Sequence, residues 1–142
     1  MEEPLVKIHY WLYPISWIYG MGVRLRNNLF DWGYYRSKSF DVPEVCVGNL
    51  AVGGTGKTPH TEYLIKLLQQ TGTNVAMLSR GYKRKSKGYV LATEETDVKR
   101  IGDEPYQIKT KFPAIRVAVD ENRCHGIEQQ MKLDHPKVDV VL

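Results

Sequence analysis

The stretch VGNLAVGGTGKTPHTEYLIKLL, residues 47–68, decides the predicted fold of this chain. Within it, AVGGTGKT at 51–58 follows the phosphate-loop pattern G-x-x-x-x-G-K-[ST], except that Ala51 replaces the first glycine. The glycines give the backbone the freedom to turn its N–H groups toward phosphate oxygens. The predicted nucleotide-binding residues are Ala51, Val52, Gly53, Gly54, Thr55, Gly56, Lys57 and Thr58.

Two of these residues carry side chains with specific roles in such a loop. Lys57 is placed to reach the β- and γ-phosphates of ATP, which makes it a candidate catalytic residue. Thr58 is placed to ligate Mg²⁺ through its hydroxyl group. We therefore predict that the chain uses ATP and Mg²⁺.

The sequence on either side of the loop favours this interpretation. Residues 44–48 read as a short buried strand, and a helix follows, with Pro59 in its first turn and Gly72 as its stop. A glycine-rich turn that reads GKT by chance is the alternative. The strand–loop–helix order argues against it, because phosphate binds well at a helix N-terminus.

The remaining pattern predicts an α/β fold. Apolar runs at 74–78, 114–119 and 136–142 read as strands, a helix is expected over 121–133, and residues 88–92 suggest a short strand of a hairpin. The strands expected at 44–48 and 74–78 are far enough apart for a crossover connection between parallel strands. We predict a P-loop NTPase-type three-layer sandwich with a mainly parallel sheet, preceded by an amphipathic N-terminal helix.

A basic run follows the strand at 74–78. It contains five cations and no acid: Arg80, Lys83, Arg84, Lys85 and Lys87. Runs of like charge are ordinarily solvated loops. Beside a phosphate loop, a site for an anionic substrate is a serious second interpretation, and the sequence leaves both open.

Two acidic positions lie downstream. Asp103 and Glu104 precede Pro105, which is what a helix start looks like. The functional alternative makes one of these carboxylates a general base that lies beside the γ-phosphate and acts on a hydroxyl nucleophile. Asp120 and Arg123 follow a predicted strand, and strand ends are where ligands bind in open α/β sheets.

The N-terminal 40 residues differ from the rest in composition. All three tryptophans lie in the first 32 residues, and apolar positions from Ile15 to Leu29 recur at helical spacing. An uncharged run of about 16 residues is too short to span a bilayer, so a helix in the membrane interface and a core helix are the alternatives. We predict two domains: a membrane-interface helical segment at 1–40 and a nucleotide-binding core at 41–142.

Charge and cysteine content narrow the class further. The net charge of +4 favours anionic partners without choosing among them. Cys46 and Cys124 stand far apart, the four histidines are scattered, and no metal site is predicted from side chains alone. Glu2 and Glu3 open the chain, so no signal peptide is predicted.

Four motifs in this order and spacing resemble one known family. VGNLAVGGTGKTP, LSRGYKRKSKG, GDEP and VAVDENR resemble the tetraacyldisaccharide 4′-kinases, the lipid A kinases of Gram-negative bacteria. LYPISWIYGMGVRLRN resembles their membrane-associated leading helix. GGTGKT is generic to phosphate loops, whereas VGN, SRGY and GDEP are specific.

The resemblance implies a function. Members transfer the γ-phosphate of ATP to the 4′-hydroxyl of tetraacyldisaccharide 1-phosphate, a lipid A precursor, and form lipid IV-A. They work at the cytoplasmic face of the bacterial inner membrane, as peripheral or monotopic proteins. The catalytic aspartate of the GDEP motif falls on Asp103. The implied partners are the lipid and the membrane surface, with no nucleic acid.

The resemblance also implies that the chain is an incomplete N-terminal lobe. Members are longer, and in them an acidic pair follows the strand that here ends at Leu142. A chain of this length alone is expected to bind nucleotide with little kinase activity.

Two other functions stay open at this stage. A P-loop ATPase or nucleotide-binding module of unknown partner is the main alternative, and a GTPase would need an NKxD-type motif that the sequence lacks. A nucleic-acid-binding protein would leave the tryptophan-rich N-terminus without a role, and the basic run has only Tyr82 as an interleaved aromatic.

Overall fold

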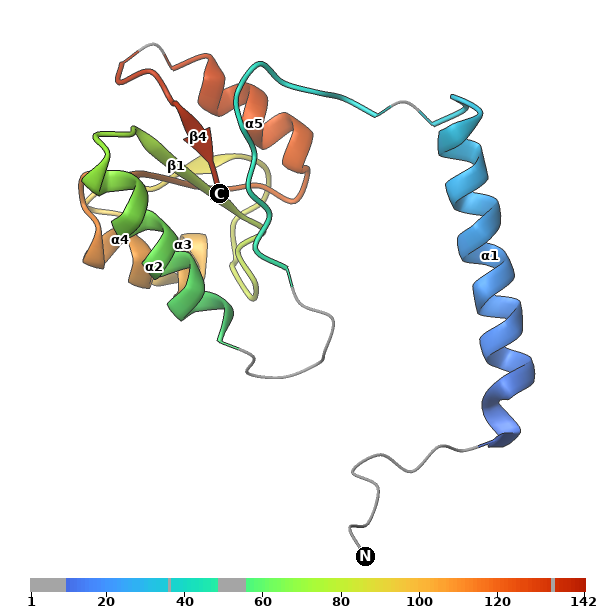
Figure 1. Ribbon diagram of the computed structural model, residues 1–142. Coiled ribbons are helices and arrows are strands. Elements are labelled where there is room, and N and C mark those ends of the chain that lie inside the picture. Colours follow the sequence, from blue (N-terminus) through green and yellow to red (C-terminus); the bar gives the residue numbers. More distant parts are fainter. Residues whose placement is uncertain (1–9, 36, 49–55, 134) are drawn as a thin grey trace, which may run out of the picture. The chain divides into compact units, whose positions relative to one another are not determined.

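The computed structural model describes residues 10–35, 37–48, 56–133 and 135–142. The chain forms two compact units, Met1–Ser39 and Phe40–Leu142, and each is considered by itself (Figure 1). The predicted loop residues Ala51, Val52, Gly53, Gly54 and Thr55 lie outside the described residues.

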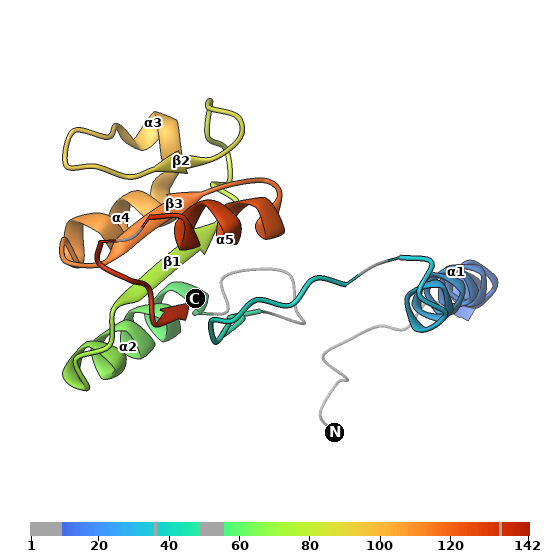
Figure 2. The ribbon, with the colours of Figure 1, turned by 90° about the horizontal axis from the view of Figure 1, so that it is seen from above.

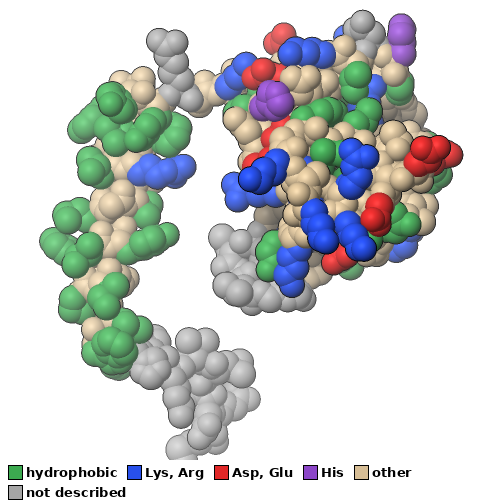
Figure 3. Space-filling view, turned by 180° about the vertical axis from the view of Figure 1, so that it is seen from behind, with side chains coloured by type: hydrophobic (Ala, Val, Ile, Leu, Met, Phe, Trp, Pro, Cys, Tyr) green, Lys and Arg blue, Asp and Glu red, His purple; other side chains and the backbone are tan. Residues whose placement is uncertain are grey.

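The described part of the first unit consists mainly of one helix. A 3₁₀ turn, η1 (Tyr10–Leu12), leads into α1 (Tyr13–Asp31), which has Pro14 in its first turn, where its missing N–H costs nothing. Residues of α1 are not buried, and Figure 3 shows apolar side chains along its length. In the described part of the chain, no helix combines the length and apolar character needed to cross a membrane.

The second unit is built on a four-stranded sheet with the order β2-β3-β1-β4. The strands are β1 (Val75–Ser79), β2 (Val90–Leu91), β3 (Arg116–Val119) and β4 (Val140–Val141). Both β3 and β4 run parallel to β1, whereas β2 is antiparallel to β3. The carboxyl ends of the three parallel strands therefore meet at one edge of the sheet.

Helices cover both faces of the sheet. Figures 1 and 2 show α2 (Lys57–Gln70), α3 (Val98–Ile101) and α4 (Asp103–Lys111) on one side and α5 (Arg123–Met131) on the other. Strand β1 serves both layers: Val75 and Met77 pack with Ile65 of α2, while Ala76 packs with Ile127 of α5. The alternation of a strand's side chains thus supports a three-layer α/β sandwich, as predicted.

Three predicted strands differ from the structure, and of the one expected at 136–142 only Val140–Val141 is a strand. Residues 44–48 make a single parallel bridge, Glu44 to Val141, rather than a strand, since β4 itself is short. Residues 88–92 do contain a strand, but β2 pairs with β3 and not with a hairpin neighbour. The pairing of Val90 with Val119 is long-range, so local sequence gave no signal for it.

Candidate functional site

The carboxyl edge of the sheet brings together segments far apart in sequence. The backbone N–H of Asp120, just past β3, donates to the carbonyl of Ser79 at the end of β1, over 3.0 Å. The N-terminus of α2 and the N-terminus of α4 meet where Thr58 contacts Glu104. These four segments carry the predicted residues that the structure describes, and they form the candidate site.

The first part of the site is the start of α2. Gly56 precedes the helix with φ of +75°, a conformation that favours glycine, and no side chain caps the helix. Uncapped N–H groups and the helix dipole make such an end suitable for phosphate. Lys57, the first helical residue, is exposed. The predicted Gly56, Lys57 and Thr58 thus stand where an anion can be held.

A hydrogen bond joins this helix start to the GDEP motif. The Thr58 hydroxyl donates to Glu104 Oε1 over 3.1 Å. Further along the same two helices, Lys111 Nζ lies 2.7 Å from Glu62 Oε1, and Gln107 also donates to that oxygen. From the sequence, Glu104 was treated together with Asp103, as part of a helix start or as a possible general base, and no contact with Thr58 was predicted for it. The structure makes it a candidate site residue through this contact.

Asp103 is the first residue of α4 and is exposed. It follows Gly102, whose φ of +91° and ψ of 165° belong to a region that is essentially restricted to glycine. A Cβ on Gly102 would lie 2.8 Å from the carbonyl oxygen of Tyr82. The SRGY segment and the GDEP segment are therefore in backbone contact, and this contact fixes where α4 begins.

The basic run forms a loop, residues 80–88, between β1 and β2. Arg80, Lys83, Lys85 and Lys87 are exposed, whereas the side chain of Arg84 is only 3% exposed and lies 2.8 Å from Glu121. The pKa of the Glu121 carboxyl lies below its ordinary value of 4.5. A hydrogen bond from its own backbone lowers the pKa most, burial opposes this, and the Gly88 amide and Arg84 each lower the pKa by less. The five cations are thus not equivalent.

Asp120 and Arg123 lie where the sequence predicted, at a strand end. Asp120 is buried, accepts from the Asn122 backbone at 2.9 Å, and lies 2.6 Å from Nδ1 of His125. Arg123 begins α5 and is exposed. Near Asp120, burial raises the pKa of Tyr89 above 10.0, and its hydroxyl has no partner among the described residues.

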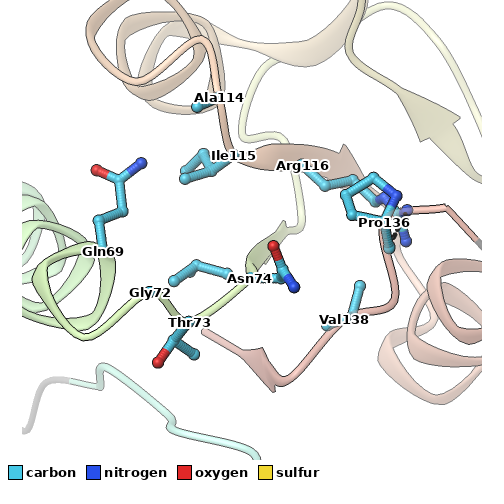
Figure 4. Close-up of a pocket in the computed structure, with 10 residues that line it drawn as sticks. Gln69, Gly72, Thr73, Asn74, Ala114, Ile115, Arg116, Pro136 and Val138 are labelled. Carbon is cyan, nitrogen blue, oxygen red and sulfur yellow. Dashed lines mark hydrogen bonds between the residues drawn. The ribbon is translucent and has the colours of Figure 1, made fainter.

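A pocket of about 230 Å³ lies elsewhere, at the amino ends of the parallel strands (Figure 4). Its lining includes Asn74 before β1, Ile115 before β3 and Val138 before β4. Arg116 donates to the carbonyls of Gln130 and Pro136 beside it, each over 2.8 Å. Since ligands of α/β sheets bind at the carboxyl edge, this pocket is not the candidate site.

Among the described residues, no group of three or more His, Cys, Asp or Glu side chains could hold a metal ion. This is compatible with Mg²⁺ chemistry, because the ion usually binds through one or two protein oxygens together with substrate phosphates and water. The adjacent oxygens of Thr58 and Glu104 suit it.

A helix start reading Gly-Lys-Thr, set at the carboxyl edge of a largely parallel sheet, defines this as an α/β protein of the P-loop class. Comparison with known proteins is more specific. The family model described as tetraacyldisaccharide-1-P 4′-kinase matches residues 8–142. The chain therefore belongs to the tetraacyldisaccharide 4′-kinase family.

Individual relatives agree with this assignment. A tetraacyldisaccharide 4′-kinase of Bacteroides thetaiotaomicron is 66% identical over 142 residues, which are 100% of this chain and 37% of the relative. A tetraacyldisaccharide 4′-kinase from Bacteroides fragilis is 67% identical over 142 residues, and the match covers 38% of that relative. The chain thus spans little more than a third of these relatives.

A solved structure has the same fold. It is described as the "apo" form of LpxK from Aquifex aeolicus in complex with ATP, and it matches with a TM-score of 0.76 and 38% identity. The match covers 92% of this chain and 42% of that one. The predicted fold class is confirmed by this likeness.

Proposed function

We propose that this chain is part of an ATP-dependent kinase that phosphorylates the 4′-hydroxyl of tetraacyldisaccharide 1-phosphate and forms lipid IV-A. The observation that carries the proposal is the hydrogen bond between Thr58 and Glu104. It joins the helix start of the phosphate loop to the family-specific GDEP motif in one site. Family membership over residues 8–142 supports the same acceptor.

ATP is the proposed phosphoryl donor. The uncapped start of α2 and the exposed Lys57 suit binding of its phosphates. The Aquifex aeolicus relative is described in complex with ATP, which supports the same donor here. In this proposal Lys57 contacts the β- and γ-phosphates and stabilises the charge that develops on the transferred group.

Magnesium is the proposed metal. Thr58 and Glu104 would hold it from the protein side, and the ion would neutralise phosphate charge when bound. Asp103, next to Glu104 and exposed, is the proposed general base, taking the proton from the acceptor hydroxyl. The start of α4 would thus supply one carboxylate toward the metal and one toward the acceptor.

The membrane surface is the proposed place of action, on the cytoplasmic face of the inner membrane. Helix α1 supports this, because Trp17, Tyr19 and Ile18 are each more than 60% exposed. Aromatic rings with nearby arginines suit the headgroup region of a bilayer, and Arg24 and Arg26 lie on the same helix. An acceptor with four acyl chains stays in the bilayer, so its kinase must reach it there.

The test is transfer of labelled γ-phosphate from Mg·ATP to tetraacyldisaccharide 1-phosphate in neutral detergent micelles. Two proteins are compared: this chain, and the same chain extended past Leu142 with the C-terminal part of the Bacteroides thetaiotaomicron relative. We expect transfer by the extended protein. ATP turnover without transfer by either protein would refute the lipid kinase proposal and leave a P-loop ATPase.

A further inference from the structure

Arg84 is the buried member of the basic loop, residues 80–88. Its side chain is 3% exposed, so it cannot meet a ligand at the surface. Its guanidinium donates to Ser86 Oγ over 3.1 Å and to the Gly88 carbonyl over 2.9 Å. These bonds fold the loop back on itself around the arginine.

The same guanidinium anchors the loop to the end of β3. One of its nitrogens lies 2.8 Å from Glu121 Oε1, and the other carboxylate oxygen accepts from the Gly88 backbone N–H at 2.9 Å. Glu121 directly follows Asp120 at the carboxyl edge. The glutamate thus holds one side of the loop by both its oxygens.

The other side of the loop is held by the segment that leads into α4. The Lys85 backbone N–H donates to the Lys99 carbonyl over 2.8 Å, and the Ser86 hydroxyl donates to the Arg100 carbonyl. The close approach of Gly102 to the Tyr82 carbonyl continues this contact up to Asp103. The loop therefore lies between the end of β3 and the proposed base.

The four other cations project from this anchored backbone. Arg80, Lys83, Lys85 and Lys87 are exposed, and the Lys83 ammonium stands 5.3 Å from the ring centre of Tyr82, which is itself 81% exposed. Lys83 also has φ of +59°, which is uncommon for a residue with a side chain and needs support from its surroundings. An unanchored loop would not hold these charges in fixed positions.

We propose that Arg84 is a positioning residue. Paired with Glu121, it holds the basic loop so that the four exposed cations extend from a fixed backbone and bind the phosphate group of the lipid acceptor. A fixed backbone matters because binding then costs the conformational freedom of the side chains and not that of the loop as well. This inference rests on the proposed function for the identity of the acceptor.

The first test follows loop order without any activity. Hydrogen exchange of the Lys85 and Gly88 amides is measured by NMR in the full chain, in Arg84→Met and in Glu121→Ala. Glu121 is half exposed, so its replacement leaves the core intact even where Arg84→Met folds poorly. We expect exchange to rise about tenfold or more in both variants. Unchanged exchange at both amides would overturn the inference.

The second test uses the protein extended past Leu142, in neutral detergent micelles. It measures the KM for the acceptor and the KM for ATP separately. We expect the KM for the acceptor to rise roughly tenfold in Arg84→Met and Glu121→Ala, with the KM for ATP unchanged. Lys132→Gln removes an exposed cation at the end of α5 and is the charge-matched control for Arg84→Met, with both KM values expected to stay within about twofold.

Two results would contradict the proposed role. Equal rises in both KM values would mean that the pair merely supports the fold. A rise seen only when anionic phospholipid is added would assign the charge to membrane headgroups instead of the acceptor. Absence of transfer by the unsubstituted extended protein refutes the proposed function, whereas the exchange experiment tests the anchoring independently.

Discussion

The hydroxyl of Thr58 donates to the carboxylate of Glu104 over 3.1 Å, across 46 positions of sequence. Two helices that begin at the same edge of the sheet are thereby joined at their first turns. In the proposed site this places the phosphate-binding end of α2 beside the acidic end of α4. Four predictions follow from this arrangement and from the contacts around it.

Glu104→Ala is expected to weaken binding of Mg·ATP more than binding of ATP in the presence of a chelator. In the proposed site the carboxylate holds the ion together with Thr58. Its loss therefore lowers the affinity for nucleotide when the metal is present. We expect a fall of about 10- to 100-fold in affinity for Mg·ATP, measured by titration calorimetry.

Glu62→Ala is the matched control for this experiment. Glu62 also joins α2 to α4, through Lys111 at 2.7 Å, but at a distance from the helix starts. We expect Glu62→Ala to change the free energy of unfolding and to leave the affinity for Mg·ATP unchanged. An equal loss of Mg·ATP affinity in both variants would show that Glu104 acts only as a link between helices.

Asp103→Asn is expected to lower the rate of phosphate transfer by about 10²- to 10⁴-fold while ATP binding persists. The amide keeps the size of the side chain and its place at the start of α4, but it cannot accept the proton. Transfer rate, ATP affinity and thermal unfolding are measured together. Full transfer activity in this variant would show that Asp103 is part of the helix start and not a general base.

Gly102→Ala is expected to destabilise the fold by more than about 2 kcal/mol, because it combines backbone strain with a steric clash. Its φ is +91°, and the new Cβ would lie 2.8 Å from the Tyr82 carbonyl. Gly72→Ala offers the comparison, since Gly72 has φ of +75° with no atom within 4 Å of a Cβ.

Gly72→Ala is expected to lower the free energy of unfolding by the backbone strain alone, about 1–2 kcal/mol. Both values come from urea unfolding of the full chain. Equal costs for the two glycines would mean that the Tyr82 carbonyl moves away at little expense. The basic loop would then not be tightly held against the start of α4.

Acidification is expected to loosen the basic loop. The pKa of Glu121 is lowered below 4.5 in the folded state, first by its own backbone hydrogen bond and further by Gly88 and Arg84. The lowered pKa means that these contacts stabilise the fold above pH 4.5 and are lost as the pH falls through the folded-state pKa.

The measurement is the NMR shift of the Gly88 amide between pH 7 and pH 2. We expect a transition centred below pH 4.5 in the unsubstituted chain and none in Glu121→Gln. A transition that persists in the variant would assign the change to another carboxylate. A midpoint above 4.5 would contradict the described hydrogen bonds.

Sequence patterns predicted α2, α5, β1 and β3 to within a few residues, because each is a local feature. Helix α3 was not predicted, and the strands expected at 44–48 and 136–142 are reduced to one bridge and to Val140–Val141. Pro59 lies in the first turn of α2 and Gly72 follows its end. The acidic pair before Pro105 begins α4. The pairing of Val90 with Val119 was missed, since a two-residue strand carries no periodicity that could name its partner.

The site was predicted only in part for a similar reason. Lys57 and Thr58 were found through the spacing of their motif, and Asp103 through a family resemblance. Their roles remain predictions. The contact of Thr58 with Glu104 and the burial of Arg84 depend on how distant segments meet. Five neighbouring cations look alike in sequence, and only packing separates the buried one from the others.

The division of labour within the basic loop has a consequence for engineering. Because Arg84 and backbone groups hold the loop, the side chains of Lys85 and Lys87 are not needed to keep its shape. Lys83 differs, because its φ of +59° disfavours many other side chains. If the loop binds the acceptor as proposed, a library restricted to Lys85 and Lys87 would vary acceptor binding with little effect on thermal stability.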